Sequence, residues 1–148
     1  MSTFVKQAGM TVDTVDWGTI GWRTRPANTG CKTFVVMDVG LEPGFGHDFH
    51  KHPQQDELIT VLAGRIEQWI GKEKAILEAG DSVYLDADVV HASFNVGSET
   101  AHLQVILAPA VGDEGYQLVD VSSEHADSDR LQKWLESLDP DDLGKYKM

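Results

Sequence analysis

The chain has 148 residues, of which 41% are hydrophobic and 24% charged, and its 24 acidic and 12 basic side chains give a formal charge of −12. This length and composition predict one soluble globular domain with a core of its own, and they exclude a disordered chain. No stretch approaches the ~18–20 apolar residues of a membrane helix, which argues against a membrane partner. The acidic charge argues against nucleic acid as a partner, because phosphate binding requires basic groups.

Residues 1–32 show the weakest pattern, and we interpret them as an N-terminal arm in which Val12, Val15 and Trp17 could form a strand. From residue 33 to about 121, short segments rich in β-branched and aromatic residues alternate with Gly, Pro and Asp. The predicted strands are 33–39, 46–52, 57–63, 65–71, 73–79, 82–86, 91–96, 100–107 and 116–121. This rhythm predicts an all-β fold, an antiparallel sandwich or closed barrel, with its barrel core over about 33–121.

Two features of the strands bear on their packing. Ala63-Gly64 and Gly71-Lys72 are the expected tight hairpin turns. The segments 59–63 and 103–107 are apolar on both faces, as a strand is when one face lines a barrel and the other packs against a second sheet or subunit. We therefore expect a homodimer.

The pattern changes after residue 122. Leu131, Trp134, Leu135 and Leu138 recur at helical intervals, which predicts a short C-terminal helix over about 127–139. Pro140 disfavours helical geometry at the residue before it, so the helix should end there. With no internal repeat or linker, residues 1–148 are predicted to form a single domain.

Three histidines and one glutamate carry the functional prediction. His50 and His52 are two apart on a predicted strand, so their side chains share a face. Residues 53–56 break that strand, and Glu57 opens the next one, from which its carboxylate could reach back. His91 starts a later strand. The pattern predicts a mononuclear metal site.

The spacing of these residues resembles the two signature motifs of the cupin superfamily. The first motif corresponds to Gly44, His50, His52, Glu57 and Gly64, and the second to Gly80, His91 and Asn95. The resemblance implies a double-stranded β-helix, or jelly-roll, barrel in which His50, His52, Glu57 and His91 bind one divalent ion. Asp86 and Asp88 stand where the family usually has Pro and Gly, but Asp tolerates left-handed backbone, so the turn should persist. In the family the Asn95 position is more often structural than catalytic.

The donor set limits the ion only broadly. Neutral imidazoles with one carboxylate suit Fe, Mn, Zn, Ni, Co or Cu. Four protein ligands leave up to two positions of an octahedral ion open, which permits a reactive site. Glu57, the only carboxylate of the set, is also the candidate catalytic residue, because it could take a proton from a bound substrate.

Strand parity suggests which side chains line the pocket. Asp48 shares the face of His50 and His52, whereas His47 has the opposite parity and should point away. By the same rule the candidates are Asp48, Ile59, Val61 and Ser93, joined by either His102 with Gln104 or Leu103 with Val105.

The leading functional hypothesis is an oxygenase that uses a divalent metal and a small oxygen-chelating substrate, by analogy with cupins that act as dioxygenases. One alternative is a non-catalytic module that binds a metal or small ligand. Another is a sugar isomerase or epimerase, which would need an acid–base pair such as His102 with a carboxylate. The lone Cys31 and an N-terminus without an apolar signal segment favour a cytoplasmic location.

Overall fold

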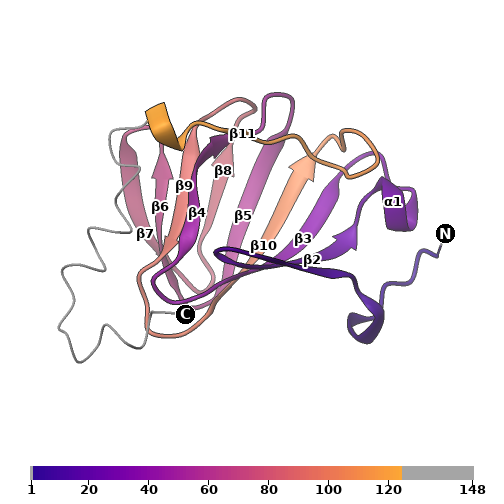
Figure 1. Cartoon of the computed structure of the whole chain (residues 1–148), viewed down its shortest axis with the longest axis horizontal. Helices are drawn as coiled ribbons and strands as arrows, with labels where there is room; N and C mark the ends of the chain where they lie inside the picture. The colour runs from indigo at the N-terminus through magenta and orange to yellow at the C-terminus, as the bar shows by residue number, and fades with distance from the viewer. Residues whose placement is uncertain (1, 125–148) are drawn as a thin grey trace.

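The protein folds as two antiparallel sheets packed face to face in a jelly roll, seen in a computed structural model that describes residues 2–124 (Figure 1). One sheet has the order β1 (Val12–Val15), β2 (Gly18–Thr24), β3 (Val35–Leu41), β10 (Ala101–Ala108), β5 (Asp56–Ala63) and β8 (Ser82–Leu85). The other has the order β11 (Val119–Asp120), β4 (Gly46–Lys51), β9 (His91–Asn95), β6 (Arg65–Ile70) and β7 (Glu73–Glu78). Short helical segments are η1 (Gln7–Gly9), α1 (Pro26–Thr29) and η2 (Ser122–Glu124). The predicted all-β jelly-roll fold is confirmed.

The main core fills the space between the two sheets. Along β10, Ala101, Leu103, Val105 and Leu107 are buried, while the residues between them are partly or fully exposed. This is the period-two pattern of a strand with one face inward. The core is therefore supplied mainly by the inner face of the six-stranded sheet.

Gly64 is the corner where the chain passes from one sheet to the other. It connects β5 to β6, which belong to different sheets, so the predicted hairpin at Ala63-Gly64 is wrong. Gly64 has φ +90°, and a Cβ there would lie 2.8 Å from the Cα of Ala101, so glycine is required on both counts. The predicted hairpin at Gly71-Lys72 is confirmed by the antiparallel pairing of β6 with β7.

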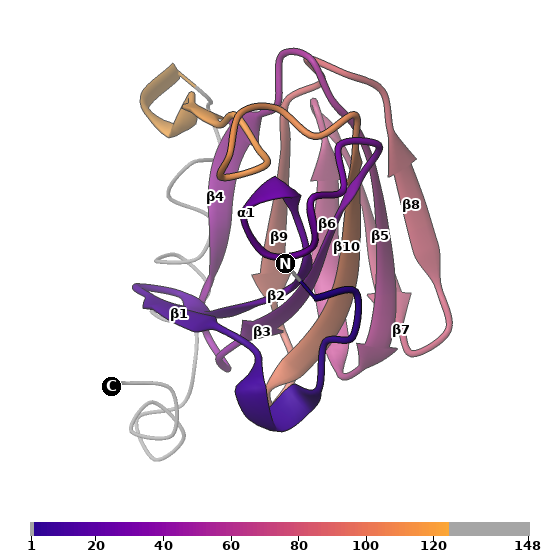
Figure 2. The ribbon, with the colours of Figure 1, turned by 90° about the vertical axis from the view of Figure 1, so that its right-hand side faces the viewer.

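The N-terminal segment is more than an arm. β1 pairs with β2, and β2 pairs with β3, so residues 12–24 extend the six-stranded sheet (Figure 2). The six-stranded sheet therefore begins at residue 12, whereas the sequence pattern predicts a barrel core that starts at about residue 33. The predicted helix at 127–139 lies outside the described residues. Among the helices that are described, none has the length and apolar character needed to cross a membrane.

Candidate metal centre

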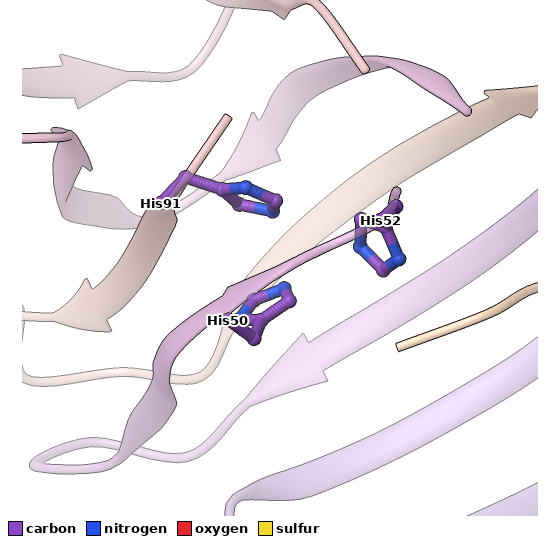
Figure 3. A group of neighbouring side chains, drawn as sticks. All are labelled: His50, His52 and His91. Atoms are coloured by element: carbon purple, nitrogen blue, oxygen red, sulfur yellow. The ribbon is translucent and has the colours of Figure 1, made fainter. Parts of the chain in front are cut away.

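Three histidines meet at one end of the space between the sheets. His50 lies on β4, His52 follows that strand directly, and His91 begins β9, where it pairs with His50 across the sheet. Their candidate ligand atoms all lie within 4.8 Å of one another, and the three residues are at most 5% exposed. Figure 3 shows the three rings around one shared space. The predicted convergence of these imidazoles is confirmed.

Hydrogen bonds to the backbone set the tautomer of each ring. The Nδ1 atoms of His50, His52 and His91 lie 2.7, 2.6 and 2.9 Å from the carbonyl oxygens of Asp48, Gln117 and Val89. A carbonyl oxygen only accepts, so each Nδ1 carries the proton and donates it. Each Nε2 atom then keeps its lone pair, which is the state that binds a metal ion.

The carboxylate of Glu57 reaches the same space from β5. Its Oε1 atom lies 2.8 Å from Nε2 of His91 and 3.4 Å from Nε2 of His52. Despite the short distance, Oε1 of Glu57 and Nε2 of His91 are buried without a hydrogen bond that satisfies either atom. Two facing electron-pair donors in a buried site need a cation between or beside them. This donor set fits a divalent transition metal.

The electrostatics keep most of the site ready to bind a cation. Burial lowers the pKa of His50 and of His52, so both rings are neutral near pH 7. Burial alone would raise the pKa of Glu57, but the neighbouring imidazoles, above all His91, lower it. Burial likewise opposes protonation of His91, yet the Glu57 carboxylate raises its pKa. The Glu57 carboxylate thus favours positive charge at this end of the cavity, which a bound metal ion would supply.

A cavity of about 160 Å³ adjoins the histidines. Its polar lining residues are His47, His50, His52, Glu57, His91 and Ser93, and the rest of its lining is apolar or aromatic. Ile59 and Ser93 line it as predicted, whereas Asp48 and Val61 are not among the lining residues. No Lys or Arg of the described chain lines it.

His102 and Gln104 do not face this cavity. Leu103 and Val105 line it instead, so the second of the two parities considered for this strand is the correct one. His102 is exposed and borders a shallow depression on the other side of the six-stranded sheet. Leu103 and Val105 face inward because burying their apolar side chains in the core between the sheets is favourable.

His47 points into the site, contrary to the parity prediction. The pairing of β4 with β9 shifts register between His47 and His50, which breaks the strict alternation along β4. The ring of His47 stacks on that of His50 with a centroid distance of 3.6 Å, and Trp17 stacks on its other face at 4.8 Å. Burial, followed by the nearby charges of His91 and His52, lowers the pKa of His47 to about 4.

Several residues around the site hold it in place. Gln55, which the sequence did not single out, donates to the carbonyls of Pro109 and Gly115 and accepts from the Gln117 amide. It thereby positions the Gln117 carbonyl that orients His52. The only signal in the sequence is that Gln55 lies in the predicted turn just before the strand of Glu57; its burial could not be predicted from that position.

Two expectations about supporting residues are confirmed. Asn95 is fully buried and bonds the backbone of Leu41, Glu99 and Gly97, which is a structural role. Asp88 adopts φ +69°, as expected of an Asp in left-handed backbone, and its amide donates to the carbonyl of His52. This turn ties the start of β9 to the end of β4.

Comparison with known proteins agrees with this geometry. The family described as "Cupin domain" matches residues 37–107. Of the curated proteins, polyketide synthase CurC of Streptomyces cyaneus is 29% identical over 84 residues, covering 57% of this chain and 54% of that protein. The uncharacterized protein YdbB of Bacillus subtilis is 41% identical over 46 residues, covering 30% and 41%. The chain thus spans about half or less of the length of these curated relatives.

Solved structures show the same fold. An RmlC-like cupin from Shewanella frigidimarina has a TM-score of 0.67 at 16% identity, covering 77% of this chain and 96% of that one. KdgF from Halomonas sp. has a TM-score of 0.65 at 16% identity, covering 77% and 99%. Oxalate decarboxylase OxdC of Bacillus subtilis has a TM-score of 0.65 at 21% identity, covering 87% and 32%.

Proposed function

Because residues 37–107 of this chain form a cupin domain with three buried imidazoles in one cavity, we propose that the protein binds one divalent transition-metal ion. The proposed ligands are His50, His52, Glu57 and His91. The observation that carries this is the group of three buried imidazoles whose candidate ligand atoms lie within 4.8 Å of one another. The Glu57 carboxylate lies close to two of them, and its Oε1 atom and Nε2 of His91 are buried without a hydrogen bond. Elemental analysis of protein purified without added metal tests it and distinguishes Fe, Mn, Zn, Ni, Co and Cu. Less than about a tenth of an ion per chain would contradict it.

We further propose that the site is an oxygenase centre for a small substrate that chelates through two oxygens. A bound Fe or Mn ion would supply a Lewis acid and a redox partner for dioxygen. The protein supplies four ligands, which leave open positions, and a cavity whose lining is mostly apolar. The fold neighbour OxdC is described with Mn(II) centres, which supports an ion of this kind in the site.

The lining of the cavity favours this substrate class over charged sugars. A sugar phosphate or a uronate would need a cationic side chain, and none in the described residues lines the cavity. Apolar walls suit diketones, enediols and phenols, whose oxygens gather at one end. Such molecules place their polar end at the histidines and their apolar part between the sheets.

Glu57 is proposed to act as a base as well as a ligand. It is buried, its pKa is lowered by the neighbouring imidazoles, and its carboxylate lies where a substrate hydroxyl would arrive. Glu57→Gln should therefore lower turnover by about 10²-fold or more while metal content falls less, since general base catalysis contributes roughly 10²–10⁴-fold. Oxygen uptake with catechol or acetylacetone measures turnover, and elemental analysis measures the metal. Equal losses in both would assign Glu57 a ligand role alone.

The alternative functions now differ in support. An isomerase or epimerase that uses His102 loses its basis, because His102 lies on the other side of the sheet. A non-catalytic module for a metal or small ligand would use the same cavity and the same ligands. It becomes the better account if the Fe- and Mn-loaded proteins show no oxygen uptake with any chelating diketone, enediol or phenol.

We also propose that the protein is a homodimer. Leu58 and Tyr84 are paired on the outer face of β5 and β8, and Leu62 lies on the same face. All three are exposed, with Leu62 at 56% and Tyr84 at 57%. Exposed apolar groups gathered in this way are typical of protein interfaces. Light scattering should give twice 16.3 kDa, and the monomer mass at micromolar concentration would contradict the dimer.

A further inference from the structure

A second polar pair lies beside the metal centre. His47 on β4 and Ser93 on β9 are direct cross-strand partners, and both line the cavity. The side chains of such partners start roughly 4.5–5.5 Å apart. His50 and His91 form the next pair along the same two strands. One wall of the cavity thus has a pair of proposed ligands and, next to it, a pair of polar side chains with no assigned role.

The ring of His47 can meet a ligand only through its edge. Trp17 covers one face at 4.8 Å with an interplanar angle of 18°, and His50 covers the other at 3.6 Å with an angle of 12°. Both ring nitrogens lie in the uncovered edge. A histidine ring carries at least one N–H donor, and that donor lies in the plane of the ring.

Ser93 offers an acceptor. Its hydroxyl donates to Oε1 of Gln68 at 2.6 Å, and the amide of Gln68 is fixed in turn by a bond to the carbonyl of Trp69. The hydroxyl proton of Ser93 is therefore already used in the bond to Gln68, and the Oγ atom can still accept a hydrogen bond from another donor. Gln68 is buried, so this arrangement is not open to exchange with solvent.

The facing wall contributes one polar side chain to the described lining of the cavity, that of Glu57. It is formed mainly by apolar side chains of the six-stranded sheet, and these are Ile20, Met37, Val39, Leu41, Ile59, Leu103 and Val105. A ligand hydroxyl in the cavity would be desolvated, and it would need partners on the His47 side.

We propose that His47 and Ser93 form a positioning pair that binds one further hydroxyl group of a small, otherwise apolar substrate. The hydroxyl donates its proton to Oγ of Ser93 and accepts the N–H of His47, so both its donor and its acceptor have a partner. The inference rests on the proposed metal site, which holds the two chelating oxygens, and it narrows the substrate to a phenol or enol with a third oxygen.

The test uses protein loaded with Zn²⁺ under anaerobic conditions, so that binding is measured without oxidation. The probes are pyrogallol and 1,2,4-trihydroxybenzene, each compared with catechol, which lacks the third hydroxyl. Calorimetry should show that the wild type prefers one of the triols over catechol by about five- to tenfold, the net gain expected when its third hydroxyl is hydrogen-bonded.

Two variants separate the pair from the metal site. His47→Phe keeps a flat ring between Trp17 and His50 but loses both nitrogens, and Ser93→Ala loses the acceptor. Each should abolish the preference while zinc content and catechol affinity stay within about twofold of the wild type, and His47→Asn should restore part of it. His102→Ala is the control and should change nothing.

The outcomes are distinguishable. If the wild type shows no triol preference, or if the variants keep it, the positioning pair is refuted and the proposed metal site is unaffected. A wild type that binds neither zinc nor catechol overturns the proposed function, and this inference with it.

Discussion

The two walls of the cavity differ in chemistry and in what they do for the molecule. β4 and β9 of the five-stranded sheet present His47, His50, His91 and Ser93, whereas β3 and β10 of the facing sheet present aliphatic side chains and Met37. The aliphatic wall belongs to the main core and contributes to stability through buried area. The polar wall contributes binding groups. Changes on one wall should therefore affect binding without much loss of stability, and changes on the other should do the reverse.

Glu57 is the exception to this division between the walls. It is the one charged residue that the six-stranded sheet sends into the cavity, and it meets His91 from the opposite wall. A metal bound there would therefore connect the two sheets. The chemistry of the site depends on a contact across the walls, not within one of them.

The largest effect is expected from removing a ligand on the polar wall. His50→Ala or His91→Ala deletes a buried Nε2 donor, so metal content should fall more than tenfold from about one ion per chain. Metal-dependent stabilisation should disappear with it, which amounts to about 2.7 kcal/mol at a metal concentration of 100 Kd. Elemental analysis after gel filtration and thermal unfolding measure the two. Unchanged occupancy in both variants would refute the ligand assignment, with His102→Ala as the matched control.

A change on the aliphatic wall should give the opposite result. Leu103 is 3% exposed and packs in the main core, so Leu103→Ala should lower the free energy of unfolding by roughly 2–5 kcal/mol. Zinc content should stay at the wild-type level, because no ligand is removed. Urea unfolding of the metal-free protein measures the loss. If Leu103→Ala were as stable as the wild type but had lost its metal, the assignment of stability to the aliphatic wall and of binding to the polar wall would be wrong.

Strand periodicity predicted the regular parts of the site and failed at the irregular one. On β5, Glu57 and Ile59 face the cavity as alternation requires, because this strand pairs without a break with β8. On β4 the register shift between His47 and His50 turns His47 inward. The residues around His47 do not predict this shift, because the register of β4 depends on its pairing with the neighbouring strands β9 and β11.

Long-range packing explains the other differences. The sequence located His50 and His52 because their spacing is local, and it located His91 through the resemblance to the second cupin motif. It did not place Trp17 over His47, because that contact depends on β2 joining β3. The sequence also did not show which face of β10 points inward. Leu103 points inward because it packs in the core between the two sheets. Contacts between distant segments are thus what the pattern alone could not supply.

The smallest expected effect is a difference in acid sensitivity between the two walls, measured on metal-free protein. The pKa of His47 is lowered to about 4 in the folded state, whereas an unfolded histidine titrates near 6.5. Between these values the unfolded chain binds more protons, so stability is complete above pH ~6.5 and falls as the pH drops toward 4. Between pH 7.5 and 5.0 the contribution of His47 to this loss is at most about 2 kcal/mol. His50 and His52, with lowered pKa, act in the same direction, and His91, with raised pKa, acts against them.

Substitutions on the two walls should change this pH profile in different ways. His47→Phe removes the titrating ring and keeps a flat side chain in the stack, so urea unfolding at pH 7.5, 6.0 and 5.0 with EDTA should show a smaller loss than in the wild type. Leu103→Ala removes no titrating group, so it should lower stability by a similar amount at every pH. If His47→Phe and the wild type lose stability equally between pH 7.5 and 5.0, the pKa of the half-buried His47 ring is not lowered in the folded protein.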